Sequence, residues 1–212
     1  MPQNPSFFSL TAMRLGRFGR HFIKINRLVL PQWLWETLIL VLEIVFIGEI
    51  YTFLNRIIKP KMRRLTERER TVAESVFGES LSYDAIWIDD RAQIGCRKGG
   101  FAYVSFRIIN VWGAMTDAHL IHELTHVWQY ERLGARYMPR AIQAQHSRMG
   151  YNYGGLQRLK DNATMGLRAF NMEQQADIVT DFFLLSNGKR AQWSDATPSD
   201  LGIYTIYIDG LA

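Results

Sequence analysis

Two histidines four residues apart carry the strongest chemical signal in this chain. They flank Glu123 in the run His122-Glu-Leu-Thr-His126, and residues four apart on a helix lie on one face, one turn above each other. Two imidazoles at this spacing bind one Zn²⁺ in many hydrolases, with the intervening glutamate placed as a general base. The run therefore predicts a zinc site. The alternative is an ordinary helix with two partly exposed histidines.

The residues around this run favour a helix. Asp117 is a suitable N-cap and Gly134 a suitable end. An apolar stripe would turn the helix toward a core, and it is formed by Leu120, Ile121, Leu124, Val127 and Trp128.

A catalytic zinc takes three protein ligands and leaves the fourth position for water. Arg132 stands six residues after His126, so a third histidine at that spacing is ruled out. The best remaining candidate is Glu173, at the start of a second helical pattern. Asp177 shares its face and is placed to accept the outer N–H of a zinc-bound histidine. For both residues the alternative interpretation is a solvated helix carboxylate.

Peptide hydrolysis passes through an oxyanion, which the metal shares with a second donor, often tyrosine or histidine. His146, Tyr151 and Tyr153 follow the predicted metal helix and are candidates for that donor. The two tyrosines could equally line the cleft or pack within a loop. His119, three residues before His122, is better placed to support the site than to ligate the metal.

Three runs together resemble a known family. They are His122-Glu-Leu-Thr-His-Val-Trp-Gln129, Tyr151-Asn-Tyr-Gly-Gly155 and Phe170-Asn-Met-Glu-Gln-Gln-Ala-Asp177. HExxH followed by a helix with ExxxD is similar to the gluzincin pattern. More narrowly, the three runs look like the metallopeptidase domain fused to the C-terminal end of certain type VI secretion spike (VgrG) proteins. The resemblance covers about residues 67 to 187.

This resemblance implies that His122, His126 and Glu173 ligate Zn²⁺ and that Glu123 is the catalytic base. It also implies an antibacterial toxin that is delivered into rival cells and hydrolyses a protein or peptide there, in the periplasm. A secretion spike or chaperone and an immunity protein would be its partners. The first 66 residues have a different character, which leaves the delivery route open.

Charge is unevenly distributed along the 212 residues. Residues 1–70 hold 12 Lys/Arg against 5 Asp/Glu, a net charge of +7, and residues 71–212 hold 13 against 15, a net charge of −2. The overall charge of +5 therefore belongs to the N-terminal part. No nucleic-acid-binding motif accompanies it, so we expect no nucleic-acid partner. A single cysteine excludes an intrachain disulfide framework.

The N-terminal part contains two unusual segments. In residues 1–30 basic residues recur every three or four positions, at Arg14, Arg17, Arg20, Lys24 and Arg27. This spacing predicts an amphipathic helix that lies on an anionic membrane or packs on the rest of the chain with a solvated basic face. Residues 38–54 are the most apolar, near the lower length limit for a membrane span, yet Glu43 and Glu49 interrupt them. The competing interpretations are a helix that is docked on the catalytic domain or lies in the membrane interface, a transmembrane anchor, and a segment that inserts during delivery, and we favour the docked or interfacial helix.

The remaining patterns complete an α+β fold, mainly helical, with a small antiparallel sheet. Thr66 and Glu69 form a predicted capping box. Strands are expected within residues 85–88, 101–106 and 108–112, and the alternation in Ile203-Tyr-Thr-Ile-Tyr-Ile208 favours a last strand. An edge strand drawn from 101–112 would hold the substrate backbone. We predict two parts, a basic and hydrophobic helical segment at 1–60 and a zincin-like metallopeptidase domain at 61–212.

Three other functions remain open at this stage. One is a cell-envelope housekeeping metalloprotease that is anchored by residues 38–54. Another is a non-catalytic module that keeps zinc for stability, although a purely structural site needs no base such as Glu123. The third is a membrane-active protein in which residues 1–58 act and the rest is a scaffold.

Overall fold

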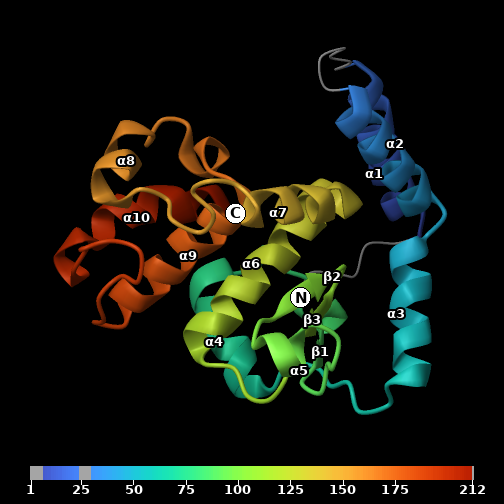
Figure 1. Ribbon diagram of the computed structural model, residues 1–212, viewed down its shortest axis with the longest axis horizontal. Coiled ribbons are helices and arrows are strands. Elements are labelled where there is room, and N and C mark those ends of the chain that lie inside the picture. Colours follow the sequence, from blue (N-terminus) through green and yellow to red (C-terminus); the bar gives the residue numbers. More distant parts are fainter. Residues whose placement is uncertain (1–6, 24–29, 212) are drawn as a thin grey trace.

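The computed structural model describes residues 7–23 and 30–211. It is mainly helical with one small sheet, which confirms the predicted α+β class (Figure 1). Lys24 and Arg27 of the predicted basic helix lie outside the described residues. The helices are α1 Phe7–Ile23, α2 Leu30–Ile44, α3 Ile47–Ile58, α4 Glu67–Phe77, α5 Cys96–Gly99, α6 Asp117–Leu133, α7 Tyr137–Gln145, α8 Gly155–Asp161, α9 Met172–Ser186 and α10 Leu201–Ile208, and the strands are β1 Trp87–Asp89, β2 Tyr103–Ser105 and β3 Ile108–Asn110.

The sheet has the order β1-β3-β2, with β3 in the centre and β2 at one edge. β2 and β3 fall within the predicted ranges and β1 extends one residue beyond its range, to Asp89, but the sheet is mixed and not antiparallel. β2 and β3 are antiparallel neighbours. β1 runs parallel to β3, because β2, which runs in the opposite direction, lies between these two strands in the chain. Ile88, Ile108 and Ile109 are fully buried, so the centre of the sheet belongs to the core.

Helix α6 runs through the middle of the molecule and packs along α9 (Figure 1). It ends at Gly134 as predicted, but its N-cap is Thr116, whose hydroxyl accepts from His119 N–H, and Asp117 is the first helical residue. A hydroxyl and a carboxylate side by side both fit an N-terminus, and the sequence pattern does not separate them. Leu120, Ile121, Leu124 and Val127 pack into the main core as predicted.

The prediction of a strand at 203–208 is wrong, because these residues form helix α10. Almost every side chain in this run is large and apolar, so its periodicity does not separate a strand from a buried helix. Tertiary contacts decide the outcome. Tyr204, Tyr207 and Leu211 are buried at helical spacing, and the Tyr207 hydroxyl donates to the Leu159 carbonyl. A local signal was present in the Thr197–Asp200 capping box with proline at the first turn.

Two basic residues of α1, Arg14 and Arg17, are turned inward, whereas Arg20 is exposed. Arg14 and Arg17 are buried and pair with Glu49 and Glu43 respectively. Arg17 also donates to the Glu131 carbonyl near the end of α6. The glutamates that interrupt the apolar segment are therefore neutralised by arginines of α1, which offsets the cost of burying them.

Across the described residues, no single helix is long and apolar enough to cross a membrane. Residues Trp33–Ile44 and Ile47–Ile58 meet the length and composition criteria only as a pair, and they are bent by 64° with respect to each other. The bend occurs at Phe46, which has a positive φ of 60°. The segment is thus two helices at an angle, with Glu43 and Glu49 in ion pairs with arginines of α1.

A substitution at Gly134 tests how tightly α1, α2 and α6 pack where they meet. The φ of Gly134 is +67°, and a Cβ there would collide with the buried Glu43 and Arg17 side chains. We expect Gly134→Ala to lower the free energy of unfolding by about 3 kcal/mol or more, since strain and a broken buried ion pair add. Gly188→Ala is the matched control, because its φ is +71° and its surroundings are open, and it should cost only about 1–2 kcal/mol. Equal losses in urea unfolding of the two variants would contradict this account of the junction.

Candidate metal centre

Two helices bring the predicted ligands together. His122 and His126 lie on one face of α6, and Glu173 lies in the first turn of α9. Asn171 caps α9 through a capping box with Gln174, which sets the start of the helix one residue before Glu173. The carboxylate therefore sits at the positive end of the helix dipole, where a negative charge is stabilised.

The inner atoms of these three residues converge on one point. Glu173 Oε2 lies 3.4 Å from His122 Nε2 and 3.2 Å from His126 Nε2, and the three potential ligand atoms all lie within 4.8 Å of one another. Metal–ligand bonds of about 2.0–2.1 Å at tetrahedral angles would separate neighbouring ligand atoms by about 3.4 Å. Glu173 Oε2 is also buried without a hydrogen-bond partner among the described residues. This arrangement is suited to hold a metal ion.

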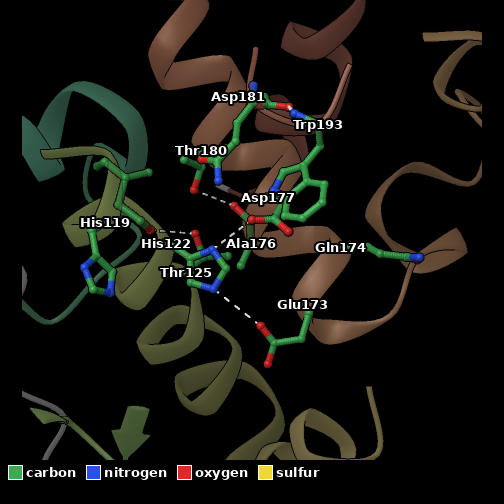
Figure 2. Close-up of polar contacts among 12 residues, drawn as sticks. His119, His122, Thr125, Glu173, Gln174, Ala176, Asp177, Thr180, Asp181 and Trp193 are labelled. Carbon is green, nitrogen blue, oxygen red and sulfur yellow. Dashed lines mark hydrogen bonds and ion pairs between the residues drawn. The ribbon is translucent and has the colours of Figure 1, made fainter. Parts of the chain in front are cut away.

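The outer atom of each candidate ligand is held by a hydrogen bond. His122 Nδ1 donates to Asp177 Oδ1 over 3.1 Å, as predicted for Asp177, and Figure 2 shows this carboxylate and Glu173 around the His122 ring. His126 Nδ1 donates to Gln129 Oε1 over 2.9 Å. Gln145 Nε2 donates to Glu173 Oε1 over 2.9 Å.

Such partners set the imidazole tautomers and leave Nε2 of each histidine and Oε2 of Glu173 facing the shared point. Sequence reasoning missed both glutamines. Gln129 was detectable three residues after His126, on the same helix face, whereas no local pattern connects Gln145 with Glu173.

The electrostatics of the cluster favour a cation. Burial alone would lower the pKa of His122, but the adjacent Asp177 and Glu173 carboxylates raise it to about 10. Burial would raise the pKa of Glu173, but the two histidines hold it well below its ordinary value. Carboxylates that hold a proton on an imidazole so tightly would equally stabilise a metal ion at the same place.

Glu123 faces the same cavity, which has a volume of about 650 Å³. Its Oε2 is buried without a partner in the described part of the chain, and His119 Nε2 lies 3.4 Å from its Oε1. Glu123 is therefore a carboxylate beside the metal-ligand cluster but outside it, and His119 stands next to it at the cavity wall. This is the placement that a general base requires.

The structure brings only some of the predicted donors to the cavity. Tyr151 lines it, 6.2 Å from the His122 ring between centroids. His146 lies outside the lining residues, where its ring contacts the Ile142 carbonyl. Tyr153 is completely buried and donates to Asp181. Tyr137, which sequence reasoning missed, also lines the cavity, with its ring 5.5 Å from His126.

Both tyrosines at the cavity stay protonated at neutral pH. Burial, reinforced by Glu173, Asp177 and Glu123, raises the pKa of Tyr151 to about 12. Burial, reinforced by Glu123 and Glu173, raises the pKa of Tyr137 well above its ordinary value. Each phenol is therefore a hydrogen-bond donor in the working pH range.

One curated protein shares sequence with this chain. The type VI secretion system spike protein VgrG2b of Pseudomonas aeruginosa is 30% identical over 138 residues, which cover 59% of this chain and 13% of the spike protein. The chain thus spans only a small part of the length of that relative. No family model matches, and no solved structure matches. The similarity supports a link to type VI secretion.

Removal of Asp177 tests whether it orients a metal ligand. We expect Asp177→Ala to weaken zinc binding about 10–100-fold, because the His122 ring loses the acceptor that fixes its tautomer and direction. Asp161→Ala is the control, since that exposed carboxylate lies outside the cavity lining. Competition with a chromophoric chelator would measure both affinities. Equal affinities would show that Asp177 has no such role.

Proposed function

We propose that this chain is a zinc-dependent metallopeptidase that acts as an antibacterial effector of type VI secretion. The observation that carries the proposal is the convergence of His122, His126 and Glu173 on one point, with the carboxylate of Glu123 in the same cavity and its Oε2 without a partner among the described residues. Three ligands and a separate carboxylate fit a catalytic site better than a structural one, which usually closes with four protein ligands.

Bound at His122, His126 and Glu173, a zinc ion would supply Lewis acidity for the attacking water and the scissile carbonyl. Glu123 takes the proton from that water and delivers it to the leaving amine nitrogen. Tyr151 and Tyr137 donate hydrogen bonds toward the oxygen on which negative charge develops. His119 lies beside Glu123 and stabilises its negative charge when protonated.

The substrate of the proposed enzyme is an extended peptide. Strand β2 is an edge strand, and the stretch Gly100 to Ser105 lines the cavity that holds the catalytic residues. An extended chain that pairs with β2 would lie across the cavity with its backbone hydrogen-bonded and its side chains alternating. The expected substrate-binding strand thus lies at the cavity, and its role is part of this proposal.

The effector part of the proposal rests on the similarity to the spike protein. It implies delivery with a spike or chaperone, action in the periplasm of the target cell, and an immunity protein in the producing cell. A cell-envelope housekeeping protease would use the same chemistry, and the apolar faces of α2 and α3 favour it as the second candidate.

Two variants of the full-length chain separate metal binding from catalysis. We expect Glu123→Gln to retain about one zinc per chain but to lose peptide cleavage at least 10²-fold, since only the base is removed. Glu173→Ala should lose zinc and activity together. Elemental analysis and cleavage of a casein-derived peptide mixture would be followed in the same preparations. Full zinc content in Glu173→Ala would show that the third ligand is wrong, and cleavage by Glu123→Gln at the wild-type rate would remove Glu123 as the base.

Directed expression tests the effector role. Wild-type protein exported to the periplasm of a bacterial host should reduce viable counts by at least tenfold, whereas the Glu123→Gln variant should not. The same proteins retained in the cytoplasm serve as the control for compartment. Full viability with active wild-type enzyme in the periplasm would contradict an antibacterial role and leave the peptidase chemistry intact.

A further inference from the structure

Helices α2 and α3 each expose a continuous apolar stripe on the side that faces away from their buried contacts. The exposed positions recur at intervals of three and four residues, so each set lies on one helix face. All eleven side chains are between 39% and 74% exposed, and they are Leu34, Trp35, Leu38, Val41, Leu42 and Val45 along α2 and the turn after it, and Ile50, Phe53, Leu54, Ile57 and Ile58 along α3.

Soluble monomers rarely expose so many neighbouring apolar side chains. Contiguous apolar patches larger than a few hundred Å² usually mark interaction sites. In Figure 1 both helices lie at one edge of the molecule, and α3 stands beside the sheet. The acidic residues of the two helices do not contribute charge to these stripes. Glu36 pairs with Arg140, and Glu43 and Glu49 pair with Arg17 and Arg14.

A cationic cleft borders the apolar stripe of α3. A cavity of about 270 Å³ is lined by Phe53 of that stripe together with Arg56, Arg64 and Trp87. The two guanidinium groups lie 4.7 Å and 3.7 Å from the centroid of the Trp87 ring, and both arginines are exposed.

In the described part of the chain no carboxylate is bonded to Arg56 or Arg64. The acidic residues that line the same cavity pair with other arginines, Asp84 with Arg70 and Glu49 with Arg14. The Asp84 carboxylate only partly offsets the effects of burial and of Arg56, which together lower the pKa of Arg64. The cleft therefore presents two positive charges and several donors beside an apolar face, which is suited to a phosphate group whose substituent is apolar.

We propose that the outer faces of α2 and α3 bind the surface of an anionic lipid bilayer, with lipid phosphate groups at the Arg56–Arg64 cleft. Apolar stripes next to cations match the acyl and headgroup layers of such a surface. The two helices together also have the length and composition of a membrane segment, although the 64° bend separates them.

A second copy of the chain is a poorer occupant, since a two-fold contact at this edge would bring the cationic clefts of both copies together. The bilayer contact also differs from the one expected of the basic helix at 1–30, because Arg14 and Arg17 are buried in ion pairs. It does not depend on the peptidase activity.

Vesicle flotation with the full-length protein tests this inference. Wild type should float with vesicles of phosphatidylcholine containing 30% phosphatidylglycerol and bind vesicles of phosphatidylcholine alone at least tenfold more weakly. Phe53→Glu/Ile57→Glu should lower binding to the anionic vesicles at least tenfold. Arg56→Gln/Arg64→Gln should lower binding to the anionic vesicles about thirtyfold, because each cation near the surface contributes about fivefold. This variant should therefore no longer prefer the anionic vesicles over those of phosphatidylcholine alone.

Ile94→Glu is the matched control for the apolar change, since Ile94 is 84% exposed on another part of the surface and its binding should equal wild type. Arg168→Gln is the control for lost charge. Unchanged thermal unfolding would show that each variant is folded. Absence of wild-type flotation would overturn the proposal. So would a dimer in solution that Phe53→Glu/Ile57→Glu dissociates, because the face would then be an interface between copies.

Discussion

The packing of α6 against α9 buries one carboxylate between two imidazoles, and the rest of the site depends on this contact. Glu173 is 1% exposed, and a carboxylate at that depth is stable only with positive partners. The two histidines provide them, and a capping box fixes the start of α9 so that Glu173 faces α6. Asp177 and Gln129 accept hydrogen bonds from the outer nitrogens of the two histidines, and Gln145 donates one to the outer oxygen of Glu173. The inner atoms are thereby left with a geometry that favours a cation.

A second buried network shapes the wall of the cavity. Asp181, two turns after Glu173 on α9, is completely buried and accepts from the Tyr153 hydroxyl and from the backbone N–H groups of Gln192 and Trp193. Both of these residues line the cavity, and the Trp193 ring stacks on Tyr151. One face of α9 therefore supplies three carboxylates: the candidate ligand Glu173, Asp177, which holds the His122 ring, and Asp181, which anchors the loop with Gln192 and Trp193.

The N-terminal helices are joined to the same framework from the other end of α6. Arg17 donates to the Glu131 carbonyl, and the Glu131 carboxylate pairs with Arg107 after β2. Buried ion pairs of this kind contribute little net stability compared with apolar packing, but loss of one partner is costly. They orient α1 to α3 so that Arg14 and Arg17 face inward while many apolar side chains of α2 and α3 face outward, opposite to the usual arrangement of a helix on a soluble protein.

The sequence by itself determined the chemistry that is local. Spacings of four placed His122 with His126 and Glu173 with Asp177, and the Thr66–Glu69 capping box marked the start of α4, because helix periodicity and capping depend on neighbours within one or two turns. Only the tertiary structure decided that Gln145 and Tyr137 join the site, that Tyr153 does not, that 203–208 is helical and that Arg14 and Arg17 of α1 are buried. These outcomes arise from contacts between residues far apart in the chain, for which no local pattern exists, and burial in such contacts overrides propensity and charge pattern.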